Sequence, residues 1–281
     1  MDIPEEMVGS VGDLIKAGEQ IRRKFKADDD AREEIWYRGQ PKASLSLVPT
    51  LYRDDVEPFH YDEPSLLDRF MALSTPLLGR QPSSDMEWYF LARHHGLPSR
   101  LLDWTEDILA AAFFALEPHI PKSRLELDRL CRGDVRPEEK PEDVCPVVWV
   151  LDAGTLNLAS LGKDGIVMTN GPTSAKYLPH SVKGDRGAGN ALPIALYPPR
   201  ANARIAAQHG TFTVHGHKRE PLDEIALTSS SLRLGRIRIG ASAIPQFCAD
   251  LRVMARHRLS IYQDLDSVAH HVCWTMQSAR P

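Results

Sequence analysis

The segment Ile108–Leu116 constrains the fold more than any other part of this chain, because it is apolar on every face. A helix without a polar face has to be covered on all sides, so we expect it to be central and buried. Thr105 is placed to cap this helix, with Glu106 and Asp107 favourable for the dipole at its first turn. A chain of 281 residues is long enough to build a core around it.

The polar stretch Arg93–Thr105 comes directly before this helix and is the first candidate for a functional site. It gathers histidines, arginines, an aspartate and a tryptophan in one short segment. A helix is predicted ahead of it, because Ser84–Glu87 has the pattern of a capping box and Gly96 and Pro98 are typical stop signals. We therefore expect these polar side chains on a short, rigid connector between two packed helices.

The composition is that of an ordinary soluble protein, with 42% hydrophobic and 26% charged residues. The formal net charge of -4 argues against a whole surface that binds nucleic acid, although it leaves room for a local basic patch. The cysteines are far apart without a Cys-x-x-Cys pair, so neither a zinc site nor a disulfide framework is expected. With no signal peptide and no membrane-spanning stretch in the sequence, the predicted location is the cytoplasm.

Strands and helices do not alternate regularly along the chain, which predicts an α+β fold and not a regular parallel sheet. We expect an N-terminal helical extension in residues 1–30 and one domain in residues 31–281. Strands are predicted at Ile35–Tyr37, Val147–Asp152, Ala191–Leu196 and Leu232–Ile239, and a turn or short helix leading into a strand at Arg204–Val214. Further helices are predicted at Ser10–Phe25, Leu66–Leu78, Ser242–Met254 and Asp264–Trp274, an extended piece at Ser44–Tyr52, and surface segments at Asp28–Asp30, Arg132–Asp143 and Gly162–Asn190.

Arginines near the ends of regular elements indicate a ligand that carries phosphate, because a guanidinium binds phosphate or carboxylate through paired hydrogen bonds. Arg38 is the strongest of them, since a charge directly after apolar strand residues has to point somewhere specific. Arg100 has two interpretations, an ion pair with the nearby Asp103 or a contact with the ligand. The other members of this group are Arg200 and Arg204.

Other polar residues of the stretch also have a structural interpretation beside the functional one. His95 fits a cap at the end of the first helix as well as a catalytic role. It is adjacent to His94, so the two face different directions on a helix, and the spacing of a zinc motif is absent. Asp103 fits an extension of the cap of the second helix, and Trp104 fits the core. No P-loop, dinucleotide glycine motif or serine-hydrolase elbow occurs, which disfavours those enzyme classes.

Taken together, these segments resemble the FRG domain family. The stretch Leu97–Thr105 carries the likeness most specifically, and Tyr37–Gln40 matches the family's aromatic-Arg-Gly-Gln element. Further matching pieces are Pro49–Arg53, Arg204 with Gln208, Gly210 and Phe212, and Gln263–Asp266, so the likeness runs roughly from Ile35 to Trp274. Two residues depart from the family pattern. Arg93 replaces a glutamine and so puts a cation where the family has an amide, and Ser99 replaces a threonine and keeps a hydroxyl.

The resemblance implies an ADP-ribosyltransferase-like fold, with a split, mainly antiparallel sheet and surrounding helices around a cleft. It implies an NAD-dependent ADP-ribosyltransferase or NAD glycohydrolase that acts as a bacterial toxin or phage-defence effector. The alternative is a non-catalytic module that senses a nucleotide or nucleic acid in the same cleft. Expected partners are NAD as substrate, a nucleic-acid or protein acceptor, and a toxin–antitoxin or defence partner, with no membrane and no metal.

In that interpretation the catalytic residues are Arg38, Gln208 and Asp103, with Arg38 ranked first. Enzymes of this fold typically use a glutamate late in the chain, and the corresponding segment offers Gln208 and no carboxylate. Asp103 or Asp264 would then have to serve in the oxocarbenium-like step. Contacts with NAD are expected from Tyr37, Gln40, His94, His95, Ser99, Arg100, Trp104, Arg204 and Phe212. Among these, an aromatic ring of Tyr37, Trp104 or Phe212 would stack on the nicotinamide.

Overall fold

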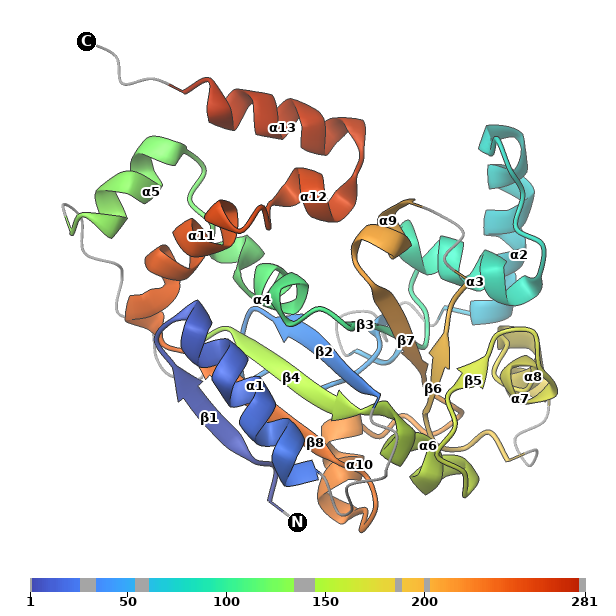
Figure 1. Ribbon diagram of the computed structural model, residues 1–281. Coiled ribbons are helices and arrows are strands. Elements are labelled where there is room, and N and C mark those ends of the chain that lie inside the picture. Colours follow the sequence, from blue (N-terminus) through green and yellow to red (C-terminus); the bar gives the residue numbers. More distant parts are fainter. Residues whose placement is uncertain are drawn as a thin grey trace.

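A computed structural model describes residues 2–25, 34–53, 61–133, 145–184, 189–199 and 203–277. Within these residues an eight-stranded sheet runs in the order β1-β8-β4-β2-β3-β7-β6-β5 (Figure 1). The strands are β1 (Glu5–Val8), β2 (Ile35–Gln40), β3 (Leu101–Thr105), β4 (Val147–Asp152), β5 (Val167–Met168), β6 (Ile194–Tyr197), β7 (Gly210–Val214) and β8 (Leu234–Ile239). The outer pairs β1/β8 and β5/β6 are parallel, and the pairs between them are antiparallel. The predicted α+β class with a mostly antiparallel sheet is confirmed.

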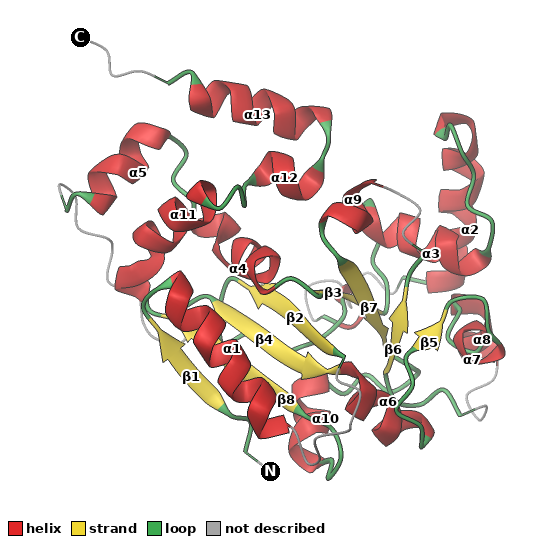
Figure 2. Cartoon of the chain, in the orientation of Figure 1, coloured by secondary structure: helices red, strands yellow, loops and turns green. Residues whose placement is uncertain are grey.

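The sheet is weakly joined at its middle. Strands β2 and β3 share the residue pair Tyr37 with Thr105 and diverge beyond it. By contrast, β2 pairs with β4 along its whole length, and β3 does the same with β7. Figure 2 shows the consequence, because β1, β4 and β2 run in a different direction from β7, β6 and β5. Strands β2 and β3 are therefore joined over a shorter length than they are with their other neighbours.

Helix α4 (Ile108–Leu116) covers the middle of the sheet and is buried along most of its length. The prediction of a central, buried helix is confirmed. It packs closely on β2 because Gly39 has no side chain, and a Cβ there would lie 1.9 Å from the Ala111 carbonyl oxygen. The predicted cap at Thr105 is wrong, because Asp107 accepts hydrogen bonds from the helix N–H groups and Thr105 ends strand β3.

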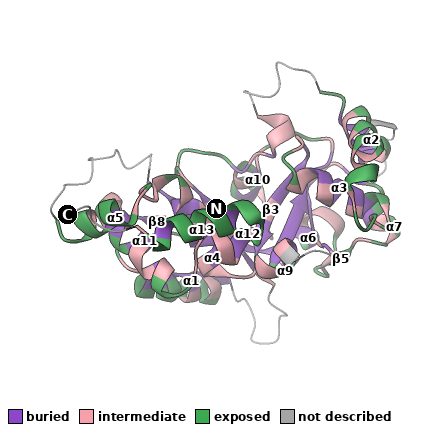
Figure 3. Ribbon diagram, turned by 90° about the horizontal axis from the view of Figure 1, so that it is seen from above, coloured by how far each residue is buried: buried purple, intermediate pink, exposed green. Residues whose placement is uncertain are grey.

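Helices cover both faces of the sheet. With α4, α1 (Val11–Phe25) and α11 (Ile244–Val253) pack on the face that carries Val148 and Val150 of β4. Alternate residues of β4 face the opposite core, as the period of a strand requires. The remaining helices are α2 (Glu63–Ser74), α3 (Asp85–His94), α5 (Arg124–Cys131), α6 (Ala153–Leu161), α7 (Pro172–Ala175), α8 (Pro179–Gly184), α9 (Ala203–Ala207), α10 (Leu222–Thr228), α12 (Arg258–Tyr262) and α13 (Leu265–Thr275), with 3-10 turns η1 (Thr50–Tyr52), η3 (Thr75–Leu77), η4 (Glu117–His119) and η6 (Ala241–Ala243). In Figure 3 the strands are buried and the outer helix faces are exposed.

The stretch Arg93–Thr105 is not the simple connector between two helices that its sequence predicts. Its last residues form β3, a strand in the middle of the sheet, with Leu101 and Leu102 completely buried. The register with β7 gives the backbone of this segment its hydrogen-bond partners. A strand whose partner lies more than a hundred positions later cannot be identified from the local pattern, so the segment reads as a turn.

Most other predicted elements are observed with shifted ends. Ser84 caps α3 as expected, and its side chain accepts a hydrogen bond from the Glu87 N–H. The extended piece Ser44–Tyr52 ends in the turn η1, and the surface segment after residue 162 contains β5, α7 and α8. The predicted loop at residues 28–30, the loop residues 134–143 and Arg200 lie outside the described residues. Among the helices that are described, none is both long enough and apolar enough to cross a bilayer.

The N-terminal segment belongs to the same sheet and core as the rest of the chain. Strand β1 pairs with β8 from Glu5 to Val8, and α1 buries Leu14 and Ile21 completely. The boundary at residue 30 between a helical extension and a domain stays a prediction. Residues 5–25 nevertheless complete one edge and one face of the sheet.

Candidate functional site

A cavity of about 380 Å³ lies where β2 and β3 diverge. Small-molecule sites have volumes of roughly 300–1,000 Å³, so the cavity has the size of a ligand site. Several of the predicted site residues line it together: Tyr37, Arg38, His94, Asp103, Trp104, Arg204, Gln208 and Phe212. The tertiary structure thus brings together residues from β2, α3, β3, α9 and β7 that are widely separated in the sequence.

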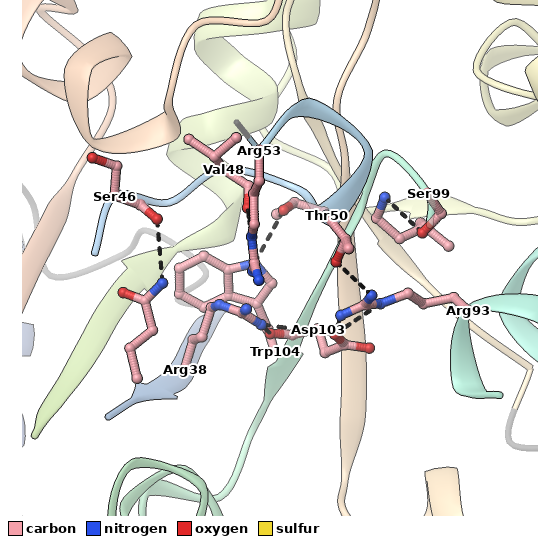
Figure 4. A network of polar contacts seen from close by, with 12 residues as sticks. Arg38, Ser46, Val48, Thr50, Arg53, Arg93, Ser99, Asp103 and Trp104 are labelled. Carbon is pink, nitrogen blue, oxygen red and sulfur yellow. Dashed lines mark hydrogen bonds and ion pairs between the residues drawn. The ribbon is translucent and has the colours of Figure 1, made fainter. Parts of the chain in front are cut away.

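Asp103 stands between two arginines of the cavity wall (Figure 4). Arg93 donates from Nε and Nη2 to the Oδ2 atom of Asp103, at 3.1 and 2.7 Å. Arg38 donates from Nη1 to the Asp103 backbone carbonyl at 2.5 Å, and this nitrogen lies 3.8 Å from the carboxylate. A third contact of Arg93, to the Thr50 hydroxyl at 2.8 Å, fixes the position of its guanidinium. The three charged side chains therefore form one network on the wall.

This network sets the charge of the wall. Burial on its own raises the pKa of Asp103, but the charges of Arg93 and Arg38 outweigh it and hold the pKa below its ordinary value. Asp103 is therefore ionised at neutral pH, while its side chain stays 47% exposed. Burial lowers the pKa of Arg38 to about 10, although the Asp103 carboxylate opposes that change. Arg38 is still charged at neutral pH.

Two guanidinium groups of the cavity have unmet hydrogen-bonding capacity. The Nε atoms of Arg38 and Arg204 are buried and have no hydrogen-bond partner among the described residues. Arg204 instead packs on the face of Tyr262, with its Cζ 4.4 Å from the ring centroid. Buried polar groups almost always have partners in folded proteins, so unmet donors at a cavity indicate a site for an anion.

Aromatic rings and a neutral histidine complete the lining. Phe212 is held by stacking on Phe90, with the ring centroids 4.6 Å apart. The Trp104 indole N–H donates to the Thr213 hydroxyl at 3.0 Å, which locks its orientation. Burial and the nearby charge of Arg204 lower the pKa of His94 to about 4, so this imidazole is neutral at physiological pH. The cavity thus offers flat apolar surfaces beside its charges.

Gln208 lines the cavity and is held by hydrogen bonds to the backbone. Its side-chain amide donates to the Ile261 carbonyl at 3.2 Å, and its own backbone carbonyl accepts from the Thr105 hydroxyl at 2.6 Å. Asp264, the alternative acid, caps α13 and is exposed, and it does not line the cavity. Among the described lining residues, Asp103 alone supplies a carboxylate.

Four predicted site residues lie outside the cavity lining: Gln40, His95, Ser99 and Arg100. Arg100 is buried and donates from Nε to Glu63 at 2.6 Å, so the expected local pair with Asp103 is wrong. Gln40 is buried and accepts a hydrogen bond from the Trp149 indole. The Ser99 hydroxyl faces the Leu101 backbone N–H, and His95 is exposed beside Phe70.

The prediction that Asp103 extends the cap of the second helix is wrong, because Asp103 lies on β3. The residue that sequence reasoning left out of the site is Arg93, which lines the cavity and pairs with Asp103. The sequence feature that could have identified Arg93 is that it replaces the glutamine of the family pattern. The sequence does not show that its partner is the aspartate ten positions later, because a strand and a helix carry them. Phe114 of α4 is a second lining residue that the sequence did not single out.

Comparison with protein families identifies the region that contains most of this wall. Residues 33–124 match the family model of the FRG domain. This range includes β2, α3, β3 and α4, and so both strands between which the cavity lies. Residues 33–124 are therefore similar to the FRG domain, as the motifs indicated. Searches among curated proteins and among solved structures found no match.

Proposed function

We propose that the cavity between β2 and β3 binds NAD and that the protein breaks the nicotinamide–ribose bond, as an ADP-ribosyltransferase or NAD glycohydrolase. The observation that carries this proposal is the pair of buried Nε donors, on Arg38 and Arg204, at one cavity. A pyrophosphate bridging the two guanidinium groups would supply the missing acceptors, since Arg binds phosphate through several directed hydrogen bonds.

The charge of the wall agrees with an anionic ligand. The described lining contains three arginines and one aspartate, so it has an excess of positive charge. The neutral His94 adds none. Phe212, Phe114 and Tyr37 add apolar faces on which a nicotinamide or adenine ring would stack. A ligand with a diphosphate between two flat rings matches this combination of groups.

The arrangement of the sheet supports the same proposal. An ADP-ribosyltransferase-like fold has a split, mainly antiparallel sheet with the cleft at the split. Here β2 and β3 are joined at Tyr37 and Thr105 and diverge from there, and the cavity lies at that divergence. We infer that the chain has this fold, with β2 and β3 as the strands on either side of its cleft.

The proposed reaction needs few groups. When the nicotinamide–ribose bond breaks, nicotinamide leaves as a neutral molecule with the electron pair, and the ribose C1′ becomes cationic. The ionised carboxylate of Asp103 would stabilise that cation, as fixed charges do in a site shielded from water. Water or an acceptor group then bonds to C1′ and loses its proton. Water as the nucleophile makes the protein a glycohydrolase, and another acceptor makes it a transferase.

Two observations favour a second candidate, a non-catalytic module that senses a nucleotide. The carboxylate of Asp103 is ion-paired with Arg93, which offsets the charge it would offer to a cation. Gln208, in the place of the usual glutamate, is tied to a backbone carbonyl. Both features leave binding intact and weaken the case for bond cleavage.

Incubation with NAD and measurement of free nicotinamide separates the two candidates. For the enzyme, we expect release that is lost in Arg38→Ala and in Asp103→Asn. Arg129→Ala, which changes an exposed arginine of α5, is the matched control and should keep full activity. No release, together with NAD binding that disappears in Arg38→Ala, would identify the sensor. Release that survives both site substitutions would mean that this cavity is not the site.

We further propose that the protein acts as a toxin or defence effector in bacteria, an expectation that rests on the family resemblance. Growth arrest on expression, relieved by Arg38→Ala and unchanged by Arg129→Ala, is the expected result. Growth that is unaffected by the unmodified protein at high expression, in the absence of a partner protein, would argue against it.

A further inference from the structure

A second cavity, of about 140 Å³, lies between η4, α11, α12 and α13. These elements lie on the same side of the sheet as α4 (Figure 1). The lining is rich in cationic and imidazole side chains, namely Lys122, Arg252, Arg256, Arg258, His257 and His270. Glu117 is the one carboxylate among the described lining residues.

The positive charge of this second cavity is only partly neutralised. Arg256 pairs with Asp107 at 2.8 Å, and Arg258 pairs with Glu117. Arg252 contacts the face of Trp274 at 4.1 Å, and neither it nor Lys122 has an ion pair within the described chain. Within the described residues, the charges of Arg252 and Lys122 are therefore not neutralised by an ion pair.

Burial adds to this preference. The Arg256 Nε atom is buried without a hydrogen-bond partner among the described residues, as in the first cavity. Burial lowers the pKa of His270, and the charges of Arg258 and Arg252 lower it further. Burial, and after it the positive charge of Arg124, also lower the pKa of Arg252. For His270 and Arg252, neighbouring positive charge therefore acts in the same direction as the larger effect of burial.

Tyr262 contacts one arginine from each of the two cavities. Arg204 of the first cavity and Arg258 of the second pack on its ring, with their Cζ atoms 4.4 and 5.0 Å from the centroid. Its hydroxyl donates to Glu117 at 2.6 Å. Arginines of the two cavities therefore lie on one aromatic ring, which brings the two sites close together.

We infer that the second cavity binds a backbone phosphate of a nucleic acid whose neighbouring nucleotide is the acceptor in the first cavity. This inference rests on the proposed function. The cavity is smaller than a nucleotide site and takes a group of the size of a phosphate. In the transfer, the C1′–nicotinamide bond breaks and a bond from C1′ to an oxygen or nitrogen of the acceptor forms. The acceptor loses one proton to solvent.

Stackable rings beside the cations favour a nucleic acid over an acidic protein. His257 stacks on His271 with centroids 4.6 Å apart, and His270 lies over Trp274 at 6.1 Å. His270 is exposed, so its imidazole is accessible to a base. Sites for single-stranded nucleic acid combine cations that follow the backbone with flat rings on which bases stack. An acidic peptide would bind through the cations alone, and the rings would have no role in its recognition.

Binding of labelled single-stranded DNA and RNA oligonucleotides to the full chain, without NAD, tests this inference. We measure affinity by fluorescence anisotropy at several salt concentrations. Each single-strand phosphate contact adds about 0.7 to the slope of log affinity against log salt, so losing one weakens binding about eightfold at ~50 mM salt. We expect this loss in Lys122→Ala and in Arg252→Met, which keeps a long side chain over Trp274.

Lys163→Ala is the matched control, because it removes an exposed positive charge beyond the end of α6. Equal weakening in Lys163→Ala and Lys122→Ala would overturn the inference in favour of a general charge effect. Polyglutamate or inorganic phosphate binding as tightly as the oligonucleotides would overturn it too, in favour of an acidic protein or a small anion. Nicotinamide release is measured separately without oligonucleotide, so the proposed function and this inference can fail independently.

Discussion

Replacement of Arg100 by methionine should strongly destabilise this protein, although Arg100 lies in the most specific motif of the family. Its side chain is 2% exposed, and Nε donates to Glu63 at 2.6 Å. The remaining nitrogens donate to the carbonyl oxygens of His215 and Tyr177, at 2.5 and 2.6 Å. These contacts connect α2, the start of β3, the end of β7 and the segment after α7. Arg100 is therefore a structural bridge away from the cavity lining.

The magnitude follows from the burial of both partners. Methionine fills much of the volume but leaves the Glu63 carboxylate, 8% exposed, without its counter-charge. Breaking one partner of a buried ion pair costs about 3–5 kcal/mol. Domains have unfolding free energies of about 5–15 kcal/mol, so the variant should lose a large part of its stability. In the double variant Arg100→Met/Glu63→Gln we expect most of this loss to be recovered, because no unpaired charge remains.

Urea denaturation followed by tryptophan fluorescence measures both variants against the unmodified chain. NAD binding is measured in parallel below the unfolding transition. Loss of binding in a variant whose midpoint is unchanged would refute this reasoning and return Arg100 to the ligand site. A double variant as unstable as the single one would show that the contacts to the two carbonyls, and not the pairing with Glu63, dominate.

Other outcomes follow from the same contacts. In Gly39→Ala the new Cβ would lie 1.9 Å from a backbone atom of α4. We expect the free energy of unfolding, measured by urea denaturation, to fall by at least ~1–3 kcal/mol. Gly79→Ala, where the new Cβ meets open space, should leave it unchanged. NAD binding should be constant between about pH 6 and 8, since Asp103 stays ionised and Arg38 stays charged there. Arg93→Gln removes the main charge that lowers the pKa of Asp103. On acidification, this variant should therefore unfold at a higher pH than the unmodified chain.

The sign of the last effect follows from the direction of the pKa shift. A carboxylate whose pKa is lowered in the folded state stabilises the fold above its ordinary pKa, and this contribution is lost as the pH falls through the lowered value. In Arg93→Gln the pKa of Asp103 is lowered less. Its carboxylate therefore contributes less to the free energy of unfolding at neutral pH, and less of that contribution is lost in acid. An identical acid unfolding curve for the two proteins would contradict the role of the Arg93–Asp103 pair.

Local sequence patterns predicted the features that depend on neighbours along the chain. The central helix at Ile108–Leu116, the cap at Ser84 and the buried strand at Val147–Asp152 are all observed. Arg38 was expected at a strand and at the site, and it lines the cavity. Each of these predictions uses a periodicity or a charge within a few residues, which one segment contains in full.

The sequence by itself determined the α+β class, the likeness to the FRG domain and several of the residues that line the cavity. Only the tertiary structure decided that Asp103 lies on a strand and not on a helix cap, because β7, its pairing partner, begins at Gly210. It also decided that Asp103 pairs with Arg93, and that Arg100 pairs with Glu63. An arginine satisfies its charge with whichever carboxylate the packing of distant elements brings within reach, and that choice is made when the sheet and helices assemble.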